Sequence, residues 1–285
     1  RHSFPTRRSS DLWIDRPYAS AVGAFDWNPA QFPAPAAMIA AAHAAGLRVA
    51  LWSAPYVEDV EAAASLRLEA ENQGYFPPKV ALLTSNWGEP IDLTNPAAYA
   101  WWQGLIHNYT DMGIEGFKLD YAEDVVCELA GTRTGFRFFN GDTERRGHWF
   151  YPQGYHAAYR AALDRWAGGD GFLIGRASSW GGQRISDLIW PGDLDNDFSN
   201  HEGGRVGGLR AAIHGMVSLA ESGFPSFASD TGGYRGGMPD REVLLRWAEH
   251  TALSPFMQLG GAGTSHNPWA YDPDAVRIYR GLARL

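Results

Sequence analysis

Residues 113–124 read GIEGFKLDYAED. The apolar and glycine positions before Leu119 are typical of a buried strand, and Asp120 follows that strand directly. Lys118 places a second charge at the same tip. Removing a charge from water costs free energy unless a partner compensates for it, so this pair of charges indicates a site at the end of a strand.

Short apolar runs alternate with helical stretches on both sides of this segment. Strands are predicted near residues 12, 48, 116, 173, 188, 227 and 257. Strands that alternate with helices form parallel sheets with right-handed crossovers. We therefore expect a (β/α)8 TIM barrel of the α/β class that lacks its first strand in this chain. A doubly wound sheet is the alternative, but no glycine-rich phosphate loop follows the first predicted strand.

Proline, asparagine and glycine mark the ends of several predicted helices. Asn95 is a predicted N-cap and Gly113 a predicted C-cap of one helix. Pro35 and Gly46 stand at the two ends of another. The expected helices cover residues 35–46, 59–74, 96–113, 154–169, 207–223, 240–254 and 272–285.

The first residues do not fit the barrel pattern. Residues 1–11 show no hydrophobic periodicity and precede WIDRPY (13–18), which begins like a strand. We treat residues 1–11 as a foreign-looking leader and expect the barrel fragment to occupy residues 12–285; a natural disordered tail is the alternative. The leader lacks the apolar region of a signal peptide, and no compartment is predicted.

Composition argues against several classes of function. With 285 residues, 45% of them hydrophobic, the chain can bury one large core. The formal charge of −8 argues against a nucleic-acid partner, and no apolar run is long enough to cross a membrane. Cys127 is the only cysteine, so neither an internal disulfide nor a thiolate zinc site can form. The twelve tryptophans are as compatible with sugar stacking as with core packing.

Charged or aromatic side chains stand at the ends of most predicted strands. In a TIM barrel the C-terminal strand ends and the loops after them carry the active site. Structural ion pairs would explain one or two such residues, but not this many at one face. The residues are Asp15, Trp52, Lys118, Asp120, Arg176, Asp193 and Asp230.

Five ordered segments resemble glycoside hydrolase family 31. GFKLDYAED (116–124) resembles the nucleophile motif of the family, and GRASSWGGQRISDLIWPGD (175–193) resembles its block with an arginine and Trp-x-Gly-Asp. The resemblance extends from residue 12 to about residue 280. The further matching segments lie at 13–18 with 25–52, at 226–234 and at 244–258.

The resemblance implies a retaining α-glycosidase on a TIM barrel, without the accessory β-domains of full-length members. It implies Asp120 as the nucleophile and Asp193 as the acid/base. Cleavage with retention needs two carboxyl groups about 5–5.5 Å apart, on opposite sides of the anomeric carbon. Asp195 and Asp197 are alternatives for the acid/base, and a turn aspartate is the alternative reading of Asp193.

The resemblance also implies contacts to the sugar. Asp15 and Arg176 would bond its hydroxyl groups, and Lys118 would orient it. Asp230 would bond within the same pocket or brace Arg176. Glu123 is a candidate partner behind the site, or a glutamate at a helix N-terminus.

Tryptophans are the candidate walls of the sugar pocket. The candidates are Trp190, Trp52 and Trp87. Each is also compatible with packing in the core, and this alternative is the stronger one for Trp87.

Two departures from the family pattern concern the substrate. Family α-glucosidases place a small apolar residue and an aspartate after the position of Asp15, where this chain has Arg16 and Pro17. They also carry Arg-x-His at strand eight, where residues 258–260 read QLG. We therefore expect a sugar other than glucose: galactose-like, deoxy, or bearing an anionic group that Arg16 pairs with. His266 is a candidate replacement for the lost strand-eight contact.

An oligosaccharide or another glycoside is the expected partner, with no metal and no cofactor. The spacing of Asp193, Asp195 and Asp197 resembles a calcium loop, but the glycine and glutamate that such a loop requires are missing. An α-galactosidase-type barrel of a related family and a catalytically inactive sugar-binding barrel fragment are the alternative functions. No oligomeric state is predicted.

Overall fold

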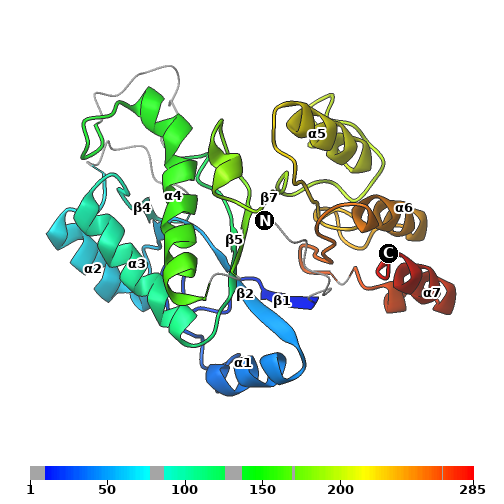
Figure 1. Cartoon of the computed structure of the whole chain (residues 1–285), viewed down its shortest axis with the longest axis horizontal. Coiled ribbons are helices and arrows are strands. Elements are labelled where there is room, and N and C mark those ends of the chain that lie inside the picture. The colour runs from blue at the N-terminus through cyan, green and yellow to red at the C-terminus, as the bar shows by residue number, and fades with distance from the viewer. Residues whose placement is uncertain (1–9, 78–86, 126–136, 169–170, 265) are drawn as a thin grey trace. The chain divides into compact units, whose positions relative to one another are not determined.

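The computed structural model describes residues 10–77, 87–125, 137–168, 171–264 and 266–285, so Cys127 lies outside the described residues. The chain divides into two compact units, residues 1–186 and residues 187–285, called unit 1 and unit 2 below. Figure 1 labels most of the helices and strands of both units.

Unit 1 is built on a parallel sheet. Strands β1, β2, β5 and β6 lie in this order, and each pairs in parallel with its neighbour. β5 is buried at all its positions, as its apolar pattern predicts for a central strand. The bounds of the strands are Ser10–Ile14 (β1), Leu47–Ser53 (β2), Gly116–Leu119 (β5) and Phe172–Gly175 (β6).

The register of the sheet places two charged residues at one level. Leu119, the last residue of β5, pairs with Ser53 of β2 and with Gly175 of β6. Asp120 and Arg176 are the next residues along the chain, so both follow the carboxyl ends of neighbouring strands. This is the edge of a parallel sheet where sites are formed.

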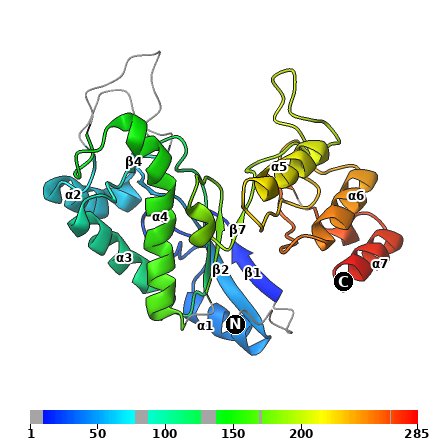
Figure 2. The same ribbon diagram turned by 45° about the horizontal axis from the view of Figure 1, so that its top comes forward.

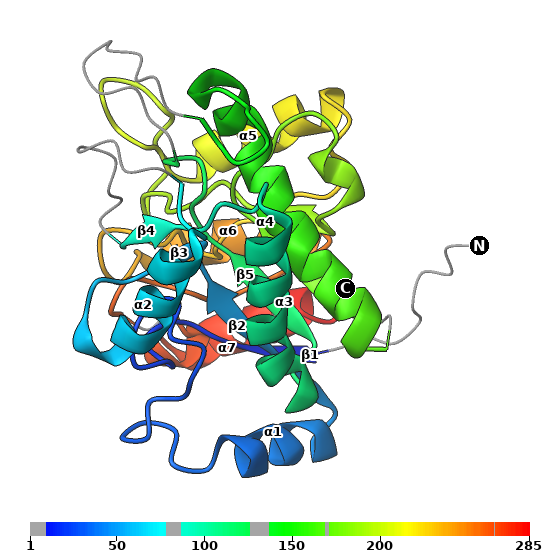
Figure 3. The ribbon, with the colours of Figure 1, turned by 90° about the vertical axis from the view of Figure 1, so that its left-hand side faces the viewer.

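Four α-helices lie among the described residues of unit 1. The side chain of Asn95 accepts a hydrogen bond from the N–H of Ala97 at 3.0 Å and caps α3, which confirms the predicted N-cap. Figures 2 and 3 show α3 and α4 side by side along the strands. The helices are Pro35–Ala44 (α1), Ala64–Gln73 (α2), Pro96–Asp111 (α3) and Glu144–Trp166 (α4).

Aromatic side chains join the sheet of unit 1 to its helices. The rings of Phe117 in β5 and Tyr159 in α4 meet edge to face, with centroids 4.9 Å apart. Trp102 of α3 and Tyr155 of α4 are fully buried in the same core. Burial of each such side chain stabilises the fold by roughly 1.5–3 kcal/mol, so this core fixes α3 and α4 against the strands.

Unit 2 has little regular strand. Single parallel bridges join Ile189 to Phe227 and Asp230 to Gln258. A separate small core contains Trp247 and its apolar neighbours. The elements of unit 2 are Leu188–Ile189 (β7), Leu209–Glu221 (α5), Arg241–Ala252 (α6) and Pro273–Leu282 (α7).

Several element boundaries differ from the predicted ones. α4 begins at Glu144 rather than at residue 154, because the helix continues through Pro152. The strands predicted near residues 227 and 257 are reduced to the two single bridges. A short antiparallel pair, Tyr56–Val57 (β3) with Glu89–Pro90 (β4), was not predicted.

β1 begins at Ser10, so the last two residues of segment 1–11 take part in the sheet. Asp11 forms an ion pair with Arg48 of β2 at 2.8 Å.

In the part of the chain that the structure describes, no helix combines the length and hydropathy of a membrane span.

Candidate active site

Asp120 lies directly after β5, and donors reach both of its carboxylate oxygens. The indole N–H of Trp52 donates to Oδ2 at 2.9 Å, and the guanidinium of Arg176 donates to Oδ1 at 2.8 Å. The backbone N–H of Asp120 donates to the carbonyl of Ser53 at 2.8 Å and fixes the turn against β2. The residue is 8% exposed. Donors on both oxygens hold the carboxyl group in one orientation.

The backbone after Asp120 is strained. Tyr121 and Ala122 have φ angles of 58° and 82°, in the left-handed region that residues with a side chain rarely adopt. The N–H of Tyr121 donates to Oδ1 of Asp120 at 2.8 Å. Strain of this kind costs roughly 1–3 kcal/mol per residue and concentrates at functional sites. Here it directs a backbone N–H onto the carboxylate.

Arg176 links two carboxyl groups. One guanidinium nitrogen reaches Asp120, and the other forms an ion pair with Glu123 at 2.7 Å. The guanidinium also lies 4.6 Å from the centre of the Tyr121 ring. Burial raises the pKa of Glu123, and the charge of Arg176 offsets part of this shift. The ion pair with Arg176 favours Glu123 as a residue that supports the site from behind. It disfavours the alternative that Glu123 only stabilises the N-terminus of a helix.

Lys118 and Asp15 form the deeper part of the site. Lys118 is 3% exposed, and its ammonium lies 4.2 Å from the centre of the Trp13 ring. Burial raises the pKa of Asp15, and the positive charge of Lys118 is the strongest effect in the opposite direction. The charge of a buried lysine on β5 therefore acts on a carboxyl group that follows β1, two strands away in the sheet.

Arg16 lies over an aromatic surface at the rim of the site. Its guanidinium is 4.0 Å from the centre of the Trp87 ring and 5.9 Å from that of Trp52. The Trp87 ring in turn lies 5.6 Å from the Tyr121 ring. Arg16 and Trp52 also line a cavity of about 230 Å³ between residues 16–25 and the end of β2.

Unit 2 contains the other predicted site residues. Asp193, partly buried, follows β7 after the turn at Gly192. Asp230 is 2% exposed, and its Oδ1 accepts a hydrogen bond from the side-chain N–H of Gln258 at 2.9 Å. Gln258 belongs to the stretch that departs from the family pattern, so the departure falls on a direct contact of a predicted site residue.

His266 and Trp190 are buried in unit 2. Nε2 of His266 lies 3.0 Å from the carbonyl oxygen of Gly237, and the residue is 2% exposed. Trp190 is 1% exposed. Its stacking role stays a prediction, and burial of this degree is also typical of a core side chain.

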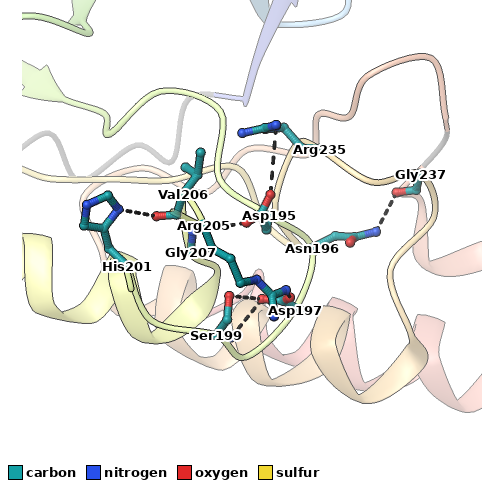
Figure 4. Close-up of polar contacts among 10 residues, drawn as sticks. All are labelled: Asp195, Asn196, Asp197, Ser199, His201, Arg205, Val206, Gly207, Arg235 and Gly237. Carbon is teal, nitrogen blue, oxygen red and sulfur yellow. Dashed lines mark hydrogen bonds and ion pairs between the residues drawn. The ribbon is translucent and has the colours of Figure 1, made fainter. Parts of the chain in front are cut away.

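The two alternative acid/base residues are engaged within their own loop (Figure 4). Oδ2 of Asp195 accepts from the backbone N–H of Gly207 at 3.1 Å. Asp197 accepts hydrogen bonds from Ser199 and pairs with Arg205. Burial acts to raise the pKa of Asp197, but the hydrogen bonds from Ser199 and the charge of Arg205 lower it overall. A carboxyl group that must hold a proton is poorly served by the contacts of Asp197. The role of Asp193 as the acid/base stays a prediction.

In the described residues, no three His, Cys, Asp or Glu side chains are grouped so that they could hold a metal ion.

Within unit 1 the structure brings Asp120, Trp52 and Arg176 into direct hydrogen-bond contact. Trp13 was missed from the sequence, although its position two residues before Asp15 in a strand predicts the same side of the sheet. The contact of Tyr121 with Asp120 has no signal in the sequence.

Known proteins share this arrangement of strands and helices. The family model described as "Glycosyl hydrolases family 31 TIM-barrel domain" matches residues 8–285. An alpha-xylosidase of Emericella nidulans is 27% identical over 91% of this chain and 32% of its own length. A sulfoquinovosidase of Escherichia coli is 27% identical over 88% of this chain and 37% of its own length. The chain therefore spans about a third of the length of these curated relatives.

A solved structure extends the likeness to three dimensions. A family 31 sulfoquinovosidase from E. rectale, in complex with an aza-sugar inhibitor, superposes with a TM-score of 0.76 at 27% identity. The superposition covers 91% of this chain and 39% of the other. The predicted TIM-barrel fold is thus confirmed, and the match disfavours a related family of α-galactosidase-type barrels. This chain belongs to the TIM-barrel domain of glycosyl hydrolases family 31.

Proposed function

We propose that this chain carries the catalytic site of a retaining α-glycosidase. The observation that supports it best is the carboxylate of Asp120, which follows a buried strand and receives donors from Trp52, Arg176 and its own turn. Such contacts orient the carboxylate, which a nucleophile requires. Names of the relatives point to α-linked sugars as the substrate class.

The proposed reaction has two steps. A carboxylate oxygen of Asp120 attacks the anomeric carbon while Asp193 donates its proton to the glycosidic oxygen, so the C–O bond breaks and the leaving alcohol departs. In the second step the carboxylate of Asp193 takes a proton from water. The water oxygen then attacks the same carbon and displaces Asp120, and the sugar leaves with its α-configuration retained.

The neighbouring side chains have supporting roles in this proposal. Arg176 and Trp52 hold Asp120 in place, and both stay close enough to contact a bound sugar. Asp15 and Lys118 are placed to bond its hydroxyl groups. For Trp190 and Asp230 in unit 2, contact with the sugar is carried over from the family resemblance, and His266 is proposed to replace the strand-eight contact that this chain lacks.

Arg16 is the residue that we propose for sugar selection. Its exposed guanidinium lies over Trp87 and near Trp52, and its positive charge also acts on the carboxyl group of Asp15. A guanidinium in such a position pairs with anionic groups through charge-assisted hydrogen bonds. We therefore propose a sugar with an anionic substituent, and galactose-like or deoxy sugars are the alternatives.

The test is covalent trapping with a panel of 5-fluoro-α-glycosyl fluorides. Intact-mass measurement should show one sugar-sized adduct, and peptide mapping should place it on Asp120. The Asp120→Asn variant is the matched control and should carry no adduct. A folded wild-type sample that forms no adduct with any sugar, or forms it elsewhere, would favour the inactive sugar-binding alternative.

A further inference from the structure

Two exposed tryptophans of unit 1 have no role in the site described so far. Trp180 is 87% exposed and Trp149 is 60% exposed, so neither ring contributes much to the core. Large apolar side chains exposed together mark interaction surfaces more often than scattered single ones. Trp149 lies on α4, and Trp180 lies in the loop after β6.

Hydrogen bonds join the backbone at the two tryptophans. The hydroxyl of Ser179 donates to the carbonyl of Trp149 at 2.7 Å. The side-chain amide of Gln153 donates to the carbonyl of Trp180 at 2.9 Å and also contacts Ser179. The loop and the helix are therefore tied together at these two residues, which are called the tryptophan pair below.

The loop that carries Trp180 has a defined conformation. Gly181 has a φ of 101°, which favours glycine, and its N–H donates to the side chain of Gln183 at 2.8 Å. A Cβ atom at Gly182 would lie 2.0 Å from the hydroxyl of Ser178. Backbone that is fixed in this way presents its side chain at low entropic cost to binding.

The tryptophan pair is continuous with the Asp120 site. Trp180 follows Arg176 by four residues, so their Cα atoms are at most about 14 Å apart. His148, the neighbour of Trp149, contacts the carbonyl of Val125 in the segment after Asp120. Both tryptophans thus belong to segments that lie close in the chain to residues following β5 and β6.

We propose that the tryptophan pair binds sugar units of an α-linked oligosaccharide substrate, beyond the unit that is cleaved off. The inference rests on the proposed function. Indole rings offer flat apolar faces with an N–H at the edge, which match the C–H faces and hydroxyl groups of pyranose rings. Continuity with the Asp120 site favours substrate over a second protein as the occupant.

The test compares two substrates of one sugar: an oligosaccharide, and the glycosyl fluoride, which has no further sugar to contact the pair. We expect Trp180→Ala to lower the ratio of kcat/KM for the oligosaccharide to that for the fluoride at least 10-fold, chiefly through KM. Trp149→Ala should also lower this ratio of kcat/KM values. Trp269→Ala removes a tryptophan of unit 2 that is 69% exposed and should leave the ratio unchanged.

Binding is measured separately, so that the proposal does not depend on turnover. Trisaccharides that carry an α-linked anionic sugar, galactose or deoxy sugar at the non-reducing end of maltose, isomaltose or nigerose are titrated into the Asp120→Asn variant with and without Trp180→Ala, and we expect a Kd at least 10-fold weaker for the double variant. A wild-type chain that hydrolyses no glycosyl fluoride contradicts the proposed activity, and the titration then decides on the pair.

Unchanged ratios and unchanged Kd values in Trp180→Ala overturn the inference. So does the absence of trisaccharide binding in the parent variant. A change of sedimentation coefficient in Trp180→Ala without a kinetic change would also overturn it, because the pair would then be a contact between copies of the chain.

Discussion

Asp120, Trp52 and Arg176 come from three neighbouring strands and meet through two hydrogen bonds. A hydrogen bond to a charged group contributes about 1.5–3 kcal/mol, which is enough to decide the orientation of one carboxylate. The indole of Trp52 is thus more than a packing residue, although it is 5% exposed.

Trp52→Phe should lower kcat/KM about 10-fold or more, because Oδ2 of Asp120 loses its donor while an aromatic ring remains. The variant should also lose some stability through the smaller ring. Trp102→Phe is the matched control, since Trp102 is fully buried in the same unit without contacting Asp120. It should lower the free energy of unfolding and spare kcat/KM. Equal kinetic losses in the two variants would refute a specific role for Trp52.

Arg16→Ala should lower the ratio of activity on anionic glycosides to activity on neutral glycosides at least 10-fold, because the charge-assisted pair is lost. Initial rates on a sulfonated or carboxylated α-glycoside and on its neutral counterpart give this ratio. Arg16→Lys should retain part of it. An unchanged ratio in Arg16→Ala would rule out the proposed selection by charge.

At the scale of elements, α4 and β6 meet at a buried histidine. His156 is fully buried, its Nδ1 lies 2.9 Å from the hydroxyl of Ser186, and its Nε2 has no hydrogen-bond partner in the described part of the chain. A Cβ atom at Gly175 would lie 2.6 Å from this ring, so the last position of β6 requires a glycine. Burial lowers the pKa of His156 to about 3.

The stability of the fold should therefore fall in acid. Below about pH 6.5 the unfolded chain binds a proton at His156, whereas the folded chain does so only near pH 3. The contribution of His156 to the free energy of unfolding is fully present above pH 6.5. It falls by about 1.4 kcal/mol per pH unit between pH 6.5 and about pH 3. Urea unfolding at pH 7 and pH 5 should show a smaller loss in His156→Asn than in wild type. His214→Asn, which removes an exposed histidine, should behave as wild type, and identical losses in all three would contradict the assignment.

The sequence predicted the start of those helices that begin with a proline or follow a capping residue. α1 and α3 begin at prolines and α3 has its capping asparagine, so both were placed correctly. The start of α4 was missed because Pro152 reads as a helix boundary, whereas packing of Tyr155 and Tyr159 stabilises the helix beyond it. Tertiary contacts of this kind leave no periodic mark in the sequence.

Some residues of the candidate site could be predicted from the sequence, whereas the long-range contacts among its side chains could not. Asp120 and Arg176 could be found because each follows a short apolar strand. The ring contact of Arg16 with Trp87 joins residues about 70 positions apart, and only the folded chain brings them together. The hydrogen bond of Gln258 to Asp230 has the same origin.

At the scale of the whole molecule, the two proposed catalytic carboxylates belong to different units. Asp120 is in unit 1 and Asp193 is in unit 2, and each unit has its own hydrophobic core. The two residues have separable tasks in the proposed reaction, because only one of them handles the proton of the leaving group.

Asp193→Ala should therefore lose activity selectively. On an alkyl α-glycoside, whose leaving group needs a proton, we expect kcat/KM to fall by 10²–10⁴-fold, the typical contribution of general acid catalysis. On the glycosyl fluoride, which departs without protonation, the loss should be much smaller. Asp120→Asn should fail on both substrates. Equal losses of Asp193→Ala on the two substrates would assign the acid to another residue.

Arg16 is exposed on a loop, whereas Asp120 is anchored to a buried strand. Substitutions at exposed positions usually change stability by no more than about 0.5 kcal/mol, whereas a buried and bonded carboxylate is costly to replace. Over evolutionary time the proposed sugar-selecting position can thus vary almost freely, while purifying selection holds the reactive one. A lineage could acquire a new carbon source through a single codon in this loop.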